Sequence, residues 1–151
     1  MVRDRGLDDV EEIVVIADRG PYDPLEVLFA DAIAREAGAR IRFVYAVGEA
    51  ATDEQLDSVN GYHDALDELC TVPTERTVLR TGSRVDALVD AAAGADLAIV
   101  STSAHHFLYD VVFGGVPDRL ATELECTVLL VHSNRPKRHT FLRYLLERVA
   151  F

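Results

Sequence analysis

Five short apolar runs, separated by amphipathic segments of about ten or more residues, constrain the fold of this chain most strongly. The runs cover residues 12–18, 39–47, 76–80, 97–101 and 127–132. Short runs rich in β-branched residues are typical of buried strands, whereas the longer segments between them have helical spacing. Strict alternation of strands and helices requires parallel pairing through right-handed crossovers. We therefore predict an α/β fold with a doubly wound, five-stranded parallel sheet.

Capping residues and glycines mark the helices between these runs. The helix starts are Asp23-Pro24, the capping box Thr52–Gln55, Ser83 to Asp86 and Pro117, and the first and third helices are expected to stop at Gly38 and Gly94. The last helix is short and ends at Leu124. The order of elements is therefore βαβαβαβαβ.

The side-chain pattern of the first two helices predicts their faces. In the first helix the apolar face is formed by Leu25, Leu28, Phe29, Ala32 and Ile33. In the second, polar helix, Leu56, Val59, Leu66 and Leu69 share helical spacing with His63, which we interpret as a helix-surface residue. His132 is interpreted as a strand-end residue.

Length and composition predict one domain without covalent staples. A chain of 151 residues, 49% of them hydrophobic, can bury about 68–70% of its unfolded surface. Cys70 and Cys126 have no metal-ligand or CxxC spacing, so reduced thiols in a cytoplasmic protein are expected. Residues 1–10 are charged and expected to be flexible, without a signal peptide, and residues 11–132 form the domain.

The charge balance excludes one class of partner. There are 26 acidic and 15 basic residues, and Lys137 is the single lysine. A chain this acidic repels phosphate backbones, so we expect no nucleic acid partner. An acid-rich composition with almost no lysine is typical of proteins from salt-loving archaea, although an ordinary solvated acidic surface explains it equally well.

The last nineteen residues, 133–151, differ from the rest in charge. They carry five basic residues and one acid, so this tail is about +4 and the remainder about −15. Its apolar residues have helical spacing and predict an amphipathic helix: Phe141, Leu142, Leu145, Leu146 and Val149. This helix is expected to pack on its own domain or across a dimer; binding to an anionic membrane surface or to a membrane transporter is the alternative.

The stretch from Asp96 to Arg119 is the predicted ligand site. A buried strand ends in Ser101, Thr102 and Ser103, and a polar loop then leads to Gly114-Gly115 before the helix start at Pro117. In open α/β sheets, ligands bind outside the carboxyl ends of the strands where strand order reverses. Free N–H groups at a helix start favour anions.

Common nucleotide motifs are absent from the chain. The first strand is followed by A-D-R-G-P-Y instead of G-x-G-x-x-G, and no P-loop G-K-[ST] occurs. The paired acids after the first strand and the lysine after the fifth that are typical of receiver domains are also missing. The order I-V-V-I-A-D, G-A-R-I-R-F-V-Y-A-V, G-S-x-V-D-A-L-V-D-A-A-A-G-A-D-L-A-I-V-S-T, F-G-G-V-P-D-R-L-A and C-T-V-L-L-V resembles the universal stress protein family over about residues 13–131.

This resemblance implies the strand order 3-2-1-4-5, in a fold of the adenine nucleotide alpha hydrolase type, and a homodimer formed through the fifth strand. ATP-binding members carry G-x-x-G, nine residues and G-[ST] after the fourth strand. Here Thr102 takes the place of the first glycine, Ala104 or His105 that of the second, and Gly115 that of the Ser/Thr, so only Gly114 is intact. Glycine permits close approach of the backbone to phosphate, and threonine or histidine does not.

The resemblance nevertheless leaves part of a nucleotide site in place. Asp18 occupies the position that contacts the nucleoside, and Ala46 and the N–H groups of Gly115 and Val116 offer backbone contacts. Together with Ser101, Thr102, His105 and Gly114, these residues form a degenerate site that is not expected to bind ATP strongly. An ATP- or AMP-binding switch that uses Gly114-Gly115 is the alternative.

Catalysis and metal binding are not expected. His105 and His106 lack a third ligand within reach in the sequence, so no metal site is predicted. Ser101, Thr102 and Ser103 have no G-x-S-x-G elbow and no positioned base. The sequence therefore predicts a non-enzymatic, cytoplasmic stress-response module.

Overall fold

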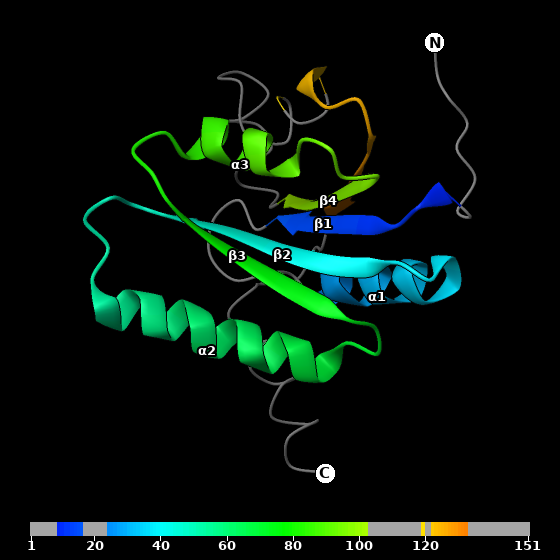
Figure 1. Cartoon of the computed structure of the whole chain (residues 1–151), viewed down its shortest axis with the longest axis horizontal. Coiled ribbons are helices and arrows are strands. Elements are labelled where there is room, and N and C mark those ends of the chain that lie inside the picture. Colours follow the sequence, from blue (N-terminus) through cyan, green and yellow to red (C-terminus); the bar gives the residue numbers. More distant parts are fainter. Residues whose placement is uncertain (1–8, 17–23, 103–118, 120–121, 133–151) are drawn as a thin grey trace.

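The computed structural model describes residues 9–16, 24–102, 119 and 122–132, without the side chains of Pro24, Ser101, Thr102 and His132. Their strands form one five-stranded parallel sheet in the order β3-β2-β1-β4-β5 (Figure 1). The strands are β1 (Glu12–Ile16), β2 (Arg40–Val47), β3 (Thr74–Arg80), β4 (Leu97–Thr102) and β5 (Thr127–His132). The predicted fold class and strand order are confirmed.

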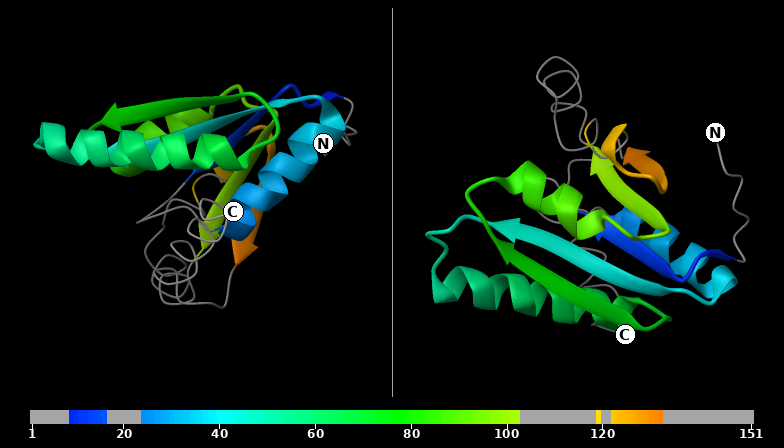
Figure 2. Two further views of the ribbon diagram at one scale, coloured as in Figure 1. Left: turned by 90° about the horizontal axis from the view of Figure 1, so that it is seen from below. Right: turned by 45° about the horizontal axis from the view of Figure 1, so that its top comes forward.

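Three helices cover the two faces of the sheet in the described ranges. The helices α1 (Pro24–Ala37) and α2 (Asp53–Leu69) lie on one face, and α3 (Arg84–Ala92) lies on the other (Figures 1 and 2). Side chains alternate across each strand, so neighbouring residues of β1 enter different cores. Ile13 and Val15 pack toward α1 and α2, whereas Val14 and Ile16 pack toward α3.

The local signals at the helix ends had different outcomes. The capping box of α2 is confirmed, because Thr52 accepts a hydrogen bond from the backbone of Gln55 and Gln55 accepts one from the backbone of Thr52. Gly38 and Gly94 follow helices with φ of 70° and 87°, conformations that favour glycine. The side chain of Ser83 does not cap α3 and donates to Asp86 instead.

The predicted apolar face of α1 is wrong except at Ile33, which is half-buried and packs on the core. Leu25, Leu28 and Phe29 are 40–46% exposed, whereas the buried apolar residues are Val27, Ala30 and Ala34. One cause is the buried Asp31, which accepts hydrogen bonds from the backbone N–H and hydroxyl of Thr71 at 2.7–3.1 Å. These bonds fix the rotation of α1 and bring its small residues against the sheet.

His63 is also placed differently from the prediction. It is 2% exposed and lies among the rings of Phe43, Tyr45 and Tyr62, with centroid distances of 6.1–6.5 Å. Helical spacing alone put His63 on the apolar stripe of α2, and the stripe packs on the sheet. His132 ends β5 as predicted.

The remaining boundaries agree within two residues where they are described. β3 starts at Thr74 instead of residue 76, and β4 continues to Thr102. Of the helix expected over 117–124, Arg119, Thr122 and Glu123 are helical. The expected flexible segment 1–10, except its last two residues, and the expected C-terminal helix 133–151 lie outside the described residues.

Candidate functional site

The strand order reverses between β1 and β4, at the centre of the sheet. β2 lies beside one edge of β1, and β4 lies beside the other. The last pair of β1 and β4 joins Ile16 to Val100, and β4 then continues through Ser101 and Thr102, which pair with Val131 and His132 of β5. The predicted site therefore coincides with the topological switch point, where open α/β sheets bind ligands.

Three of the predicted site residues belong to the described strands. Ala46 lies one residue before the end of β2, pairs with Leu79 and turns its buried side chain toward α3. Ser101 and Thr102 end β4. The other five lie outside the described residues: Asp18, His105, Gly114, Gly115 and Val116. In the sequence, Asp18 follows the last residue of β1, Ile16, by two positions.

An ion-pair cluster beside this edge was not predicted. Arg119 pairs with Asp86 of α3 and with Glu123, with N–O distances of 2.6 Å for both (Arg119 Nη1 and Nε, respectively). Asp86 also accepts a hydrogen bond from Ser83. The cluster connects the segment that follows Gly114-Gly115 to the first turn of α3, across 33 positions of sequence.

Hydrogen bonding within the cluster stabilises its charged forms. Hydrogen bonds from Ser83 and Arg119 hold the pKa of Asp86 below its ordinary value. The hydrogen bond from Arg119 likewise lowers the pKa of Glu123, and these two acids raise the pKa of Arg119. The cluster is exposed, so we expect it to contribute little to stability.

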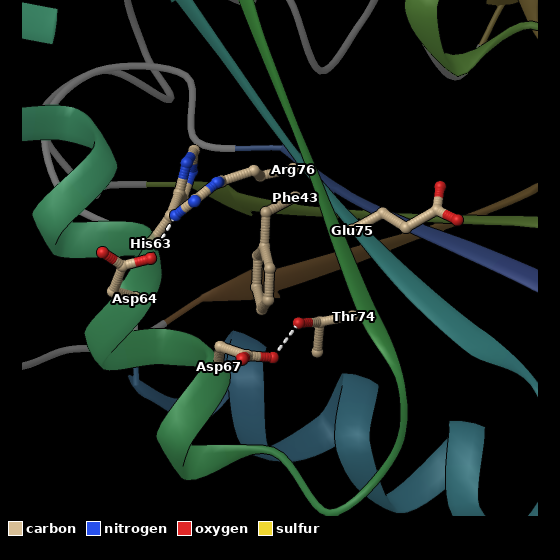
Figure 3. Close-up of a pocket in the computed structure, with 7 residues that line it drawn as sticks. All are labelled: Phe43, His63, Asp64, Asp67, Thr74, Glu75 and Arg76. Carbon is tan, nitrogen blue, oxygen red and sulfur yellow. Dashed lines mark hydrogen bonds and ion pairs between the residues drawn. The ribbon is translucent and has the colours of Figure 1, made fainter.

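A separate cavity of about 410 Å³ lies between α2 and β3 (Figure 3). Its lining consists of Phe43, His63, Asp64, Asp67, Thr74, Glu75 and Arg76. Two polar contacts lie across it, an ion pair of Asp64 with Arg76 and a hydrogen bond from Thr74 to Asp67. None of these residues belongs to the predicted nucleotide site. Thr74 begins β3, so this end of the cavity lies near the amino end of the strand.

The two cysteines are free thiols that are not activated. Cys70 and Cys126 are free and partly buried. Burial raises the pKa of Cys70 to about 12 and also raises that of Cys126, so both thiols stay protonated at neutral pH. Within the described ranges, no three His, Cys, Asp or Glu residues form a metal-binding group. No helix of these ranges has the length and apolar character needed to cross a bilayer.

Comparison with known proteins agrees with the family resemblance of the sequence. The family model of the universal stress protein family matches residues 10–132. The chain is similar to a universal stress protein solved in complex with cAMP, with 24% identity and a TM-score of 0.66 over 82% of this chain and 97% of that one. It is also similar to the universal stress protein from Archaeoglobus fulgidus in complex with dAMP, with 19% identity and a TM-score of 0.59 over 80% and 98%. No curated protein sequence matches the chain.

The match over residues 10–132 spans all five strands and the switch point between β1 and β4. The sheet order and the family match thus agree, and the chain belongs to the universal stress protein family.

Proposed function

We propose that this chain is a non-enzymatic stress-response module that binds an adenosine monophosphate, and binds it more tightly than ATP, at the carboxyl ends of β1 and β4. The observation that carries the proposal is the position of Thr102. This residue ends β4 at the switch point, where ATP-binding members of the family have the first glycine of their phosphate loop.

The chemistry of the loop favours a small phosphate group. A β-branched residue at position 102 restricts the backbone, and the loop keeps Gly114-Gly115 but neither glycine of G-x-x-G. The remaining backbone N–H groups suffice for one phosphate, whereas a triphosphate needs a longer cradle. The cAMP and dAMP complexes of the two similar structures support a monophosphate ligand.

Calorimetric titration with AMP, cAMP and ATP tests this proposal. AMP or cAMP should bind at least about tenfold more tightly than ATP, and Asp18→Ala should abolish binding of all three. The double variant Thr102→Gly/His105→Gly restores both glycines of G-x-x-G and should raise the affinity for ATP. Equal affinity for ATP and AMP in the unaltered chain would support an ATP-binding switch instead. Absence of binding by every nucleotide would refute a working site.

The edge strand β5 supports a homodimer. Leu130 is 48% exposed on β5, which pairs with β4 alone among the described strands. An exposed leucine on an unpaired edge favours association with a second copy. Light scattering should give the mass of a dimer for the unaltered chain and that of a monomer for Leu130→Glu.

The charge of the chain supports a salt-adapted cytoplasmic protein. The excess of 26 acids over 15 bases causes self-repulsion that salt screens. The melting temperature should therefore rise as KCl increases from 0.1 to about 2 M. A melting temperature that does not depend on salt would favour an ordinary acidic surface.

Incubation with ATP should release no ADP, as expected for a protein that acts by binding alone.

A further inference from the structure

The outward face of α1 is more apolar than the face that packs on the sheet. Leu25, Leu28 and Phe29 follow the spacing i, i+3, i+4 and are 40%, 44% and 46% exposed. The face on the sheet instead carries Val27 and the two alanines Ala30 and Ala34. A surface helix normally buries its larger apolar residues. A contiguous group of large exposed apolar side chains indicates a surface that something covers.

The position of α1 limits what can cover this face. α1 contacts β1, β2 and β4, and it begins at the carboxyl edge of the sheet, because it follows β1. β5 lies beside β4 and ends at the same edge with His132 (Figure 2). The chain therefore enters its last nineteen residues close to the first two turns of α1, which carry the exposed group.

These last residues, 133–151, match the outward face of α1 in chemistry and length. Their apolar stripe contains Phe141, Leu142, Leu145, Leu146 and Val149. Eight residues, 133–140, precede Phe141, and an extended segment of that length spans up to about 26 Å. The tail is also about +4 against about −15 for the rest of the chain, so charge attracts it to its own domain. The match to the family model ends at His132, so the tail is an addition to the shared domain.

We propose that residues 133–151 form an amphipathic helix that packs its apolar stripe on Leu25, Leu28 and Phe29 of the same chain. The tail replaces the solvent on the outward face of α1, and α1 becomes a buried helix between the sheet and the tail. Burial of the three side chains explains why the helix keeps large apolar residues on the face that the sheet does not use.

A double-mutant cycle on the full chain tests this contact. Phe29→Ala and Leu145→Ala should each lower the melting temperature by about 3–6 °C, and the double variant should fall no further than the larger single change. Glu36→Gln, on the exposed side of the last turn of α1, is the control and should leave the melting temperature unchanged. Additive shifts, or no shift for Leu145→Ala, would refute the contact.

Where the double-mutant cycle shows non-additive shifts, cross-linking shows whether the tail on α1 belongs to the same chain or to a second copy. In a Cys70→Ser/Cys126→Ser background, Leu28→Cys with Leu145→Cys should form a disulfide within one chain, seen as a monomer on a denaturing gel. A covalently linked dimer would instead place the tail on a second copy and overturn the proposal. Co-sedimentation of the unaltered protein with phosphatidylglycerol vesicles at 0.15 M NaCl would also overturn it, because the apolar stripe would then face lipid.

Discussion

The two ends of the parallel strands differ in how their polar side chains are held. At the amino ends, Asp96 accepts hydrogen bonds from the backbone of Glu11 and Glu12, both at 3.0 Å, and Glu12 pairs with Arg40 at 2.8 Å and Arg42 at 2.9 Å. At the carboxyl ends, the cluster of Arg119 with Asp86 and Glu123 is more open. The side chain of Glu12 is 16% exposed and that of Asp86 is 58% exposed.

From this difference we expect the amino ends of the strands to determine stability and the carboxyl ends to determine ligand binding. Partly buried charges that bridge strands contribute to the folded state, whereas exposed ion pairs contribute little. The amino ends therefore hold β1, β2 and β4 together, whereas the proposed ligand site lies at the carboxyl ends. Substitutions at the amino ends should change the free energy of unfolding but not nucleotide affinity, and substitutions at the carboxyl ends should do the reverse.

The largest effect is expected from His63, in the core between the two ends. Burial lowers its pKa to about 4, and the charge of Arg76 adds to this, whereas Asp64 acts in the opposite direction. In the unfolded chain the pKa of His63 is about 6.5. Between pH 6.5 and 4 the folded protein therefore binds fewer protons at His63 than the unfolded chain does. The stability that the neutral ring contributes is present above pH 6.5 and is lost as pH falls toward 4, up to about 3 kcal/mol.

Urea unfolding at several pH values between 7 and 4 checks this prediction. His63→Gln removes the titrating ring and should flatten the dependence over that range, even though the variant is less stable at pH 7. An unchanged slope in His63→Gln would show that other groups cause the acid sensitivity.

The next largest effect is expected from Glu12→Gln at the amino ends. Burial raises the pKa of Glu12, but the hydrogen bonds and charges of Arg40 and Arg42 outweigh it and hold the pKa below its ordinary value. The amide carries no charge and has one acceptor oxygen in place of two, so both charge-assisted pairs are lost, while Arg42 keeps its bond to the carbonyl of Ala91 at 2.8 Å. Unfolding should become easier by about 2 kcal/mol, with AMP affinity unchanged.

Glu11→Gln is the matched control for this change, because the neighbouring side chain is exposed and should affect stability by less than about 0.5 kcal/mol. The contribution of Glu12 is present at neutral pH and is lost as pH falls through its lowered pKa. A weaker affinity for AMP in Glu12→Gln would show that the two ends of the strands are not independent.

A smaller loss is expected from Asp96→Ala, which leaves two backbone N–H groups without their carboxylate acceptor. The free energy of unfolding should fall by about 1–2 kcal/mol. Asp90→Ala, an exposed acid of α3, serves as the control. Hydrogen exchange at the amide of Glu12 should become faster in Asp96→Ala, and unchanged exchange would contradict the assigned role.

The amino-acid sequence predicts the sheet well and its polar links poorly. Apolar runs and glycines are local signals, so the strands and the ends of α1 and α3 were found to within two residues. The bridge from Glu12 to Arg40 and Arg42 joins residues 28 and 30 positions apart, and no spacing rule indicates it. The apolar face predicted for α1 was mostly wrong for a related reason. The hydrogen bond from Thr71 to Asp31, 40 positions apart, sets which side of α1 faces the sheet.

The candidate site shows the same division. Its location follows from where β1 and β4 end, which apolar runs reveal, and Ser101 and Thr102 lie there. The pairing of Arg119 with Asp86 is a long-range contact between two ordinary surface residues, so the sequence contained no signal for it.

The smallest change in stability, and the clearest change in binding, is expected from Asp86→Asn. The amide weakens the pair with Arg119 and the hydrogen bond from Ser83, so Arg119 loses its link to α3. The melting temperature should stay nearly constant because the group is exposed. Calorimetry should show AMP affinity reduced several-fold, since backbone N–H groups bind phosphate only when the loop holds them in place.

Glu123→Gln provides the matched control, because it removes the other acid that pairs with Arg119 and leaves the link to α3 intact. Its effect on AMP affinity should be smaller than that of Asp86→Asn. Equal losses in the two variants would show that Arg119 acts through its own charge near the ligand rather than by connecting the glycine loop to α3. An unchanged affinity in both would place the cluster outside the binding site. The proposed difference between the two ends of the strands would then be supported by the amino ends alone.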